Sequence, residues 1–268
     1  MDAGRQSVRI EPMNVIPLQS GSKGNCFFIE SNQTRLLVDA GITFRQANLR
    51  LQSHHRDIYD VDHIFVTHDH SDHSKYIWDY QKRLSVPVHL TPKTKVAIKG
   101  SAPPDSTNSI RCFSAGDSIQ AGNILVHSIP TPHDAADGVA FVLECDGHRI
   151  GILTDLGYAF AGLKEILKSL DAVIIESNYD DTMLNSGPYP EFLKRRIRGN
   201  GGHLSNQDSA KLIYKFGSAN MQWVCLCHLS DENNCPETAI RAHQAWLGDD
   251  FPLFVANRHE VSEMMRVQ

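Results

Sequence analysis

The stretch from Thr67 to His73 (Thr-His-Asp-His-Ser-Asp-His) places five side chains that can bind metal or move protons within six residues. It directly follows Ile64–Val66, an apolar run that is typical of a buried strand. His68 and His70 lie two residues apart in what must be a turn, so both imidazoles can reach one ion. The pair Asp72-His73 opens a predicted helix and can face a second ion. Imidazole and carboxylate groups suit zinc, manganese or iron.

Three further candidate ligands each follow an extended segment. His133 comes after Pro130-Thr131-Pro132, whose prolines hold the backbone extended. Asp155 follows an apolar strand-like run, and a lone buried carboxylate is costly unless cations such as two bridged divalent ions compensate it. His228 directly follows the predicted strand Met221–Cys227. A loop histidine alone is seldom a ligand, and only the presence of the histidine-rich turn favours a metal role for these residues.

Length and composition predict one soluble domain, residues 13–268, after a polar N-terminal tail, residues 1–12. No apolar run approaches the ~20 residues that span a bilayer, so no membrane partner is expected. The six cysteines have no C-x-x-C spacing and are interpreted as buried thiols of a cytoplasmic protein. The net charge of −5 does not indicate nucleic-acid binding by the surface as a whole, but it is compatible with a local basic patch.

Two segments outside the metal candidates could contact an anion. The turn Ser20–Asn25 joins two predicted strands, and either it is only a turn or its backbone, Ser22 and Lys23 face the site. The stretch 189–198 predicts a helix with four basic residues on its exposed face: Lys194, Arg195, Arg196 and Arg198. Such a face is often only solvated. Here it leads through glycines to His203 and a capped second helix, which favours a phosphate-binding edge.

The pattern His-x-His-x-Asp-His after a strand resembles the metallo-β-lactamase superfamily in its hydrolase form. The order of strands and helices predicts an α/β protein, and the resemblance implies the αβ/βα four-layer sandwich of that family. It also implies two divalent ions, zinc or manganese with iron as a third option. The implied ligands of the first ion are His68, His70 and His133. Those of the second are Asp72, His73 and His228. The resemblance makes Asp155 the bridging ligand and gives Asp39 the role of supporting a ligand histidine from behind.

Within the superfamily the chain resembles the YycJ/WalJ-type branch. The marks are the turn at 20–25, the run from Tyr189 to Asn206, and His228-Leu229-Ser230 with Asn233-Asn234. That resemblance implies a 5′ to 3′ exonuclease and DNA, rather than RNA, as the nucleic-acid substrate. The hypothesis is a hydroxide held between the ions that attacks phosphorus.

The same hypothesis gives roles to residues around the ions. His203 is expected to contact the scissile phosphate or protonate the leaving oxygen, since imidazole can carry a proton near neutral pH. Glu176 would orient His203, and Asp72 counts as both ligand and catalytic residue. The four basic residues of 189–198, with Ser22 and Lys23, would hold substrate phosphates.

Other functions of this fold compete with the nuclease. A phosphodiesterase for a small cyclic phosphate would use the same metals without the basic helix. A thioester or lactam hydrolase has less use for His203 beside cations. A redox di-iron enzyme would carry Glu in place of His70, and a non-catalytic binding protein would be expected to lack ligands. The identity of the metal, DNA against RNA, the polarity of cleavage and the oligomeric state stay open.

Overall fold

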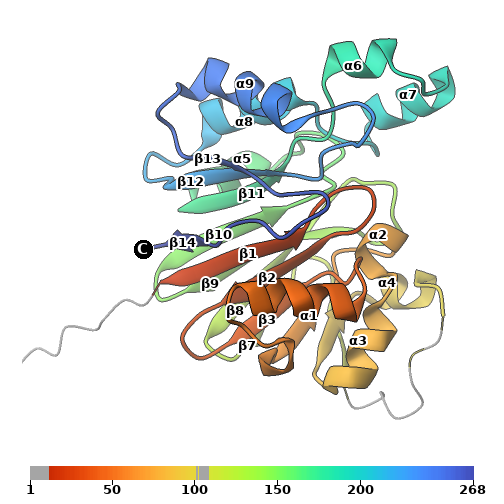
Figure 1. Cartoon of the computed structure of the whole chain (residues 1–268), viewed down its shortest axis with the longest axis vertical. Helices are drawn as coiled ribbons and strands as arrows, with labels where there is room; N and C mark the ends of the chain where they lie inside the picture. Colours follow the sequence, from red (N-terminus) through yellow and green to blue (C-terminus); the bar gives the residue numbers. More distant parts are fainter. Residues whose placement is uncertain (1–11, 101, 103–108) are drawn as a thin grey trace, which may run out of the picture.

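The computed structural model describes residues 12–100, 102 and 109–268 and places two seven-stranded sheets at the centre of the molecule (Figure 1). The first sheet, in spatial order, consists of β14 (Met265–Val267), β1 (Met13–Gln19), β2 (Cys26–Glu30), β3 (Arg35–Val38), β4 (His63–Phe65), β5 (Val88–Leu90) and β6 (Ile110–Cys112). The second consists of β13 (Leu253–Val255), β12 (Trp223–Cys227), β11 (Ala172–Glu176), β10 (His148–Leu153), β9 (Val139–Cys145), β8 (Ile124–Pro130) and β7 (Ser118–Ala121). The tail predicted for residues 1–12 lies, apart from Pro12, outside the described residues.

The strands are apolar on both faces because each sheet packs on two layers. In β2, Phe27 faces the opposing sheet and contacts a core that includes Phe141 of β9, whereas its neighbour Phe28 belongs to the outer core beneath the helices. Alternate residues of a strand point to opposite faces, so a strand covered on both sides is a continuous apolar run.

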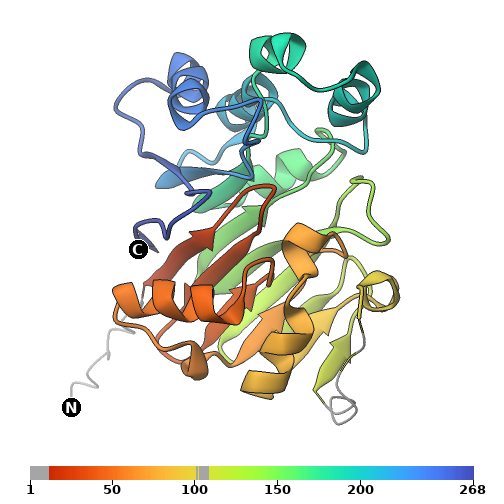
Figure 2. The ribbon, with the colours of Figure 1, turned by 45° about the vertical axis from the view of Figure 1, so that its right-hand side comes forward.

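Helices cover the outer face of each sheet (Figures 1 and 2). The connections between strands β3 and β6 of the first sheet contain α1 (Phe44–Ser53), the 3-10 turn Ile58–Asp60, α2 (Ser71–Ser74), α3 (Ile77–Leu84) and α4 (Pro92–Ala97). Those between strands β10 and β13 of the second sheet contain α5 (Leu163–Lys168), α6 (Asp181–Ser186), α7 (Glu191–Arg198), α8 (Asn206–Phe216) and α9 (Pro236–Leu247). This arrangement confirms the four-layer αβ/βα sandwich. Within residues 12–100, 102 and 109–268, no helix is both long enough and apolar enough to cross a bilayer.

Five short elements of the described residues were not predicted: β6, β14, α4, α6 and the 3-10 turn Ile58–Asp60. β14 has three residues and pairs with β1 at the far end of the chain. Three residues are too few to show a period-2 pattern, and only the long-range pairing defines this strand.

The direction of the strands decides where the loops meet. β3 to β6 run parallel to one another, and so do β10 to β13. The carboxyl ends of parallel strands open at one edge of a sheet, which is where binding sites form in such folds. The loops after β3, β4, β10, β11 and β12 therefore gather their polar residues at the same side of the molecule.

Candidate metal centre

Three buried side chains of the site, two candidate ligands and the carboxylate behind one of them, stand at strand ends where the backbone turns sharply. Asp39, Asp155 and His228 follow β3, β10 and β12, and their φ angles are +66°, +52° and +55°. This left-handed conformation is uncommon outside glycine and persists where the surroundings enforce it, often at functional sites. It turns the chain out of the strand and leaves these side chains buried at the same edge of the sandwich.

One group of three ligand atoms comes from the histidine-rich turn and the loop after β8. His68, His70 and His133 each offer a ring nitrogen, and the three nitrogens lie within 4.8 Å of one another. Nδ1 of His133 donates to the carbonyl oxygen of Gly202 (3.0 Å), which leaves Nε2, 3.3 Å from Nδ1 of His70, as the free nitrogen. Nε2 of His68 is buried and has no hydrogen-bond partner. These three residues fit the predicted first ion.

A second group comes from the start of α2 and the end of β12. Asp72, His73 and His228 form it, with the Asp72 carboxylate 3.5 Å from Nε2 of His73 and 3.3 Å from Nε2 of His228. Asn25 lies behind, its amide nitrogen 3.0 Å from Nε2 of His73. These residues fit the predicted second ion.

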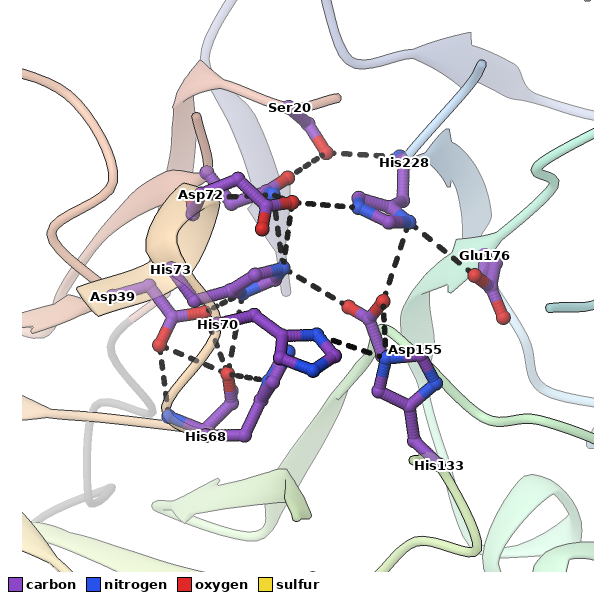
Figure 3. Close-up of polar contacts among 12 residues, drawn as sticks. Ser20, Asp39, His68, His70, Asp72, His73, His133, Asp155, Glu176 and His228 are labelled. Atoms are coloured by element: carbon purple, nitrogen blue, oxygen red, sulfur yellow. Dashed lines mark hydrogen bonds and ion pairs between the residues drawn. The ribbon is translucent and has the colours of Figure 1, made fainter. Parts of the chain in front are cut away.

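Asp155 lies between the two groups (Figure 3). Its Oδ1 is 3.6 Å from Nε2 of His133, and its Oδ2 is 3.1 Å from Nε2 of His73. Oδ2 is buried and has no hydrogen-bond partner of its own. A buried carboxylate with an unsatisfied oxygen, facing two histidine groups, is the donor set that divalent cations take. The residues present therefore fit a pair of metal ions, and their role as ligands remains a prediction.

The charges of the site are compensated internally. Burial by itself would lower the pKa of His228, but Asp155, Asp72 and Glu176 raise it to about 10. Burial would likewise raise the pKa of Glu176, but the adjacent His203 and His228 lower it to about 2. The carboxylates thus stay ionised and hold protons on neighbouring imidazoles. Since metal ligands must be deprotonated, a bound cation would displace those protons.

Asp39 contacts His73, the contact that its implied supporting role requires. Its Oδ2 accepts from Nδ1 of His73 at 2.6 Å, and its Oδ1 accepts from the backbone N–H of Thr67 at 2.8 Å. The Thr67 hydroxyl also lies within 3.0 Å of both carboxylate oxygens. With Nδ1 held by this buried carboxylate, the His73 ring keeps Nε2 for the ion.

The substitution Asp39→Asn is expected to weaken metal affinity about 10- to 100-fold, because carboxylates behind ligand histidines typically contribute that much. Asparagine tolerates the left-handed backbone and keeps the shape, so the change removes mainly the charge. Metal titration followed by calorimetry measures the effect. Asp79→Asn, on the exposed face of α3, serves as control, and equal affinities in both variants would contradict the role of Asp39.

His203 lies beside the ligands and is held in one orientation. Its Nδ1 is 2.6 Å from Oε1 of Glu176, and its ring centre is 5.1 Å from that of His133 and 5.2 Å from that of His228. The other oxygen of Glu176 accepts from the backbone N–H groups of Leu156 and Leu204, both at 3.1 Å. The predicted orienting contact between Glu176 and His203 is present.

A cleft of about 280 Å³ is lined by five of the candidate ligands, and α7 forms one of its walls. The five are His70, Asp72, His133, Asp155 and His228. Arg196 and Ser22 line this cleft, and Nε of Arg196 donates to Asp134 at 2.7 Å. Arg198 reaches Asn185 and lines a neighbouring cavity instead. Arg195 is exposed and borders neither space.

The exposure predicted for Lys194 is wrong. Its side chain is buried, and its ammonium donates to the carbonyl oxygen of Asn185 at 2.7 Å. The reason is helical geometry, since the face of α7 that bears Lys194 turns toward the C-terminal end of α6, where Asn185 lies. Lys23 is exposed, but its ammonium pairs with Asp231 at 2.7 Å, and Lys23 does not border the cleft. A contact between Lys23 and a substrate phosphate remains a prediction.

Several polar residues of the site were not predicted. Asn178 donates from its amide to the carbonyl oxygen of His228 at 2.7 Å, and the hydroxyl of Ser20 accepts from the His228 N–H at 2.9 Å. Asn25 holds the loop that carries Asp72, whose carbonyl accepts from the Asn25 N–H at 2.7 Å. Asn178 comes directly after Glu176-Ser177 at the end of a predicted strand, and this position was the signal from which a role in the site could have been predicted. Asn25 and Ser20 lie in a turn whose composition is equally typical of an ordinary connection.

Comparison with known proteins agrees with this geometry. The family model described as the β-lactamase superfamily domain matches residues 34–228. The chain is 34% identical to exodeoxyribonuclease YycJ of Bacillus anthracis, over 83% of this chain and 84% of the relative. It is 33% identical to exodeoxyribonuclease WalJ of Streptococcus pneumoniae, over 83% of each.

A solved structure shows the same fold. The metallo-β-lactamase fold protein YhfI of Bacillus subtilis superposes with a TM-score of 0.73 at 14% identity, covering 96% of this chain and 100% of that one. The family model covers most of the chain, and the sandwich and the strand-end histidines agree with it. The protein described here therefore belongs to the metallo-β-lactamase superfamily, in the branch that contains YycJ and WalJ.

Proposed function

We propose that this protein is a metal-dependent exonuclease that hydrolyses phosphodiester bonds of DNA from the 5′ end. The observation that carries the proposal is the placement of His203, fixed by Glu176, in the same cleft as the candidate metal ligands and Arg196. A proton donor beside cations and an arginine is suited to a phosphodiester. The relatives that are named exodeoxyribonucleases support the same reaction class.

Two divalent ions, zinc or manganese, would be held by the two ligand groups with Asp155 between them. When bound, they supply Lewis acidity toward a phosphoryl oxygen and lower the pKa of bound water. The ligand set is all imidazole and carboxylate, which accepts either metal, and iron as well.

The chain's own residues orient the substrate and move a proton. Nδ1 of His203 is occupied by Glu176, so Nε2 is the nitrogen that can donate a proton to the leaving oxygen. A positioned general acid of this kind typically contributes about 10²- to 10⁴-fold in rate. Arg196 and Ser22, which both line the cleft, would contact phosphate oxygens.

The direct test is incubation of the metal-loaded protein with 5′-labelled DNA, matched RNA and bis(p-nitrophenyl) phosphate. We expect mononucleotides to be released from the 5′ end of DNA with manganese or zinc, and faster than from RNA. Hydrolysis of the small ester alone, without cleavage of either polynucleotide, would replace the nuclease by a small-molecule phosphodiesterase.

Arg196→Ala is expected to weaken DNA binding and to reduce the slope of log affinity against log salt concentration by about one, as for loss of one phosphate contact. Fluorescence anisotropy over a series of salt concentrations measures both quantities. Arg195→Ala, next to it but outside the cleft, is the matched comparison and should change binding less. Equal effects of the two substitutions would mean that DNA binds to the whole exposed face of α7 and not specifically to the cleft wall.

A further inference from the structure

A second cavity adjoins the metal cleft and shares His203 with it. It lies between α8 and the segment Gly157–Ala159, and we call it the α8 cavity. Its volume is about 430 Å³, compared with about 280 Å³ for the metal cleft. That size is within the range of sites for small organic ligands. His203 borders both spaces, so the α8 cavity opens beside the proposed proton donor.

The walls of the α8 cavity combine aromatic rings with cations. Tyr158 stands on one side with 42% of its surface exposed, and Phe216, at the end of α8, is half-buried. Lys211 and Lys215 are four positions apart on α8 and so lie on the same face of that helix. Aromatic rings beside cations are the means by which proteins hold single nucleotides of a strand without reading their sequence.

The cations of the α8 cavity are not neutralised by ion pairs. Among the residues that the structure describes, Lys211 and Lys215 form no ion pair, and the Lys211 ammonium lies 6.0 Å from the centre of the Trp246 ring. The acidic side chain in the lining, Asp208, lies in the first turn of α8 and accepts from the hydroxyl of Ser205, the residue that caps this helix, at 2.9 Å. The cavity therefore favours an anionic ligand with an aromatic part.

We propose that the α8 cavity binds the nucleotide that carries the leaving oxygen, with its base stacked on Tyr158. This inference rests on the proposed nuclease function. Hydrolysis forms a bond from the water oxygen to phosphorus and breaks the bond from phosphorus to O3′. The departing O3′ takes a proton, supplied by His203. In a strand degraded from its 5′ end, that oxygen belongs to the terminal nucleotide, which is the one released.

The base of that nucleotide should then contribute to the rate. Stacking of a base on an aromatic side chain contributes about 1–3 kcal/mol, which corresponds to about 5- to 150-fold in kcat/KM. The test compares two single-stranded DNAs that differ only in the 5′-terminal residue, thymidine in one and an abasic tetrahydrofuran residue in the other. The wild-type protein, loaded with metal, should cleave the abasic DNA with kcat/KM lowered by about tenfold or more.

Variants locate the effect. Tyr158→Ala should lower kcat/KM on intact DNA about tenfold and remove the difference between the two DNAs. Lys215→Ala should lower kcat/KM on both DNAs and keep their ratio, because the lysine contacts phosphate and not the base. Tyr214→Ala is the matched control, since this exposed tyrosine of α8 does not border the α8 cavity and should leave both values unchanged.

The outcomes separate this inference from the proposed function. If the wild-type protein cleaves both DNAs with equal kcat/KM, the α8 cavity does not bind the leaving nucleotide, and the nuclease function stands. The same holds if Tyr158→Ala keeps the wild-type ratio. If neither DNA is cleaved, the nuclease function fails and the inference fails with it.

Discussion

The substitution Asp155→Asn is expected to lower kcat on DNA at least about a thousand-fold, with loss of bound metal. Asp155 directs one oxygen to each of the two ligand groups, at 3.6 Å from Nε2 of His133 and 3.1 Å from Nε2 of His73. Asparagine keeps the size and tolerates the left-handed backbone, but it has no charge and presents an NH₂ group to one of the two groups. One cation would then face a donor instead of a ligand.

Metal content by plasma mass spectrometry and kcat on 5′-labelled DNA measure the two effects together. Asp249→Asn, on an exposed turn after α9, is the control and should retain both values. A variant at position 155 that keeps its full metal content and its rate would exclude the bridging role.

Removal of the metal ions by chelation is expected to abolish activity and to lower the melting temperature by on the order of 10 °C. Two sites, each filled at about 100 times its dissociation constant, would stabilise the folded state by about 5 kcal/mol in total. A domain of this length shifts by about 2–4 °C per kcal/mol. The physical cause is the cluster of buried imidazoles and carboxylates, which has unsatisfied atoms on His68 and Asp155 until cations bind.

Differential scanning fluorimetry of the stripped protein, titrated with zinc or manganese, measures the shift. Asp72→Asn removes a ligand of the second group, so its melting temperature should rise less on metal addition than that of the wild type. A stripped protein that melts at the same temperature with and without added metal would contradict the proposed centre.

Much of the candidate site could be predicted because each candidate ligand follows a buried strand. His228 and Asp155 come directly after long apolar runs, and parallel strands in a sandwich must open at one edge, so local pattern and topology agree. The side-chain environment of α7 could not be predicted in the same way. Lys194 and Arg196 are two residues apart with similar charge, yet one is buried against Asn185 and the other lines the cleft.

By itself, the sequence determined the class of fold, the histidine-rich turn and the candidate ligands, because strand patterns and ligand types are properties of short segments. The tertiary structure alone decided which atoms meet. The hydrogen bonds that join His228 to Asn178 and to Ser20, and the α8 cavity beside His203, connect segments far apart in the chain. Such contacts depend on how whole layers pack, and no local pattern encodes the distance between two strand ends.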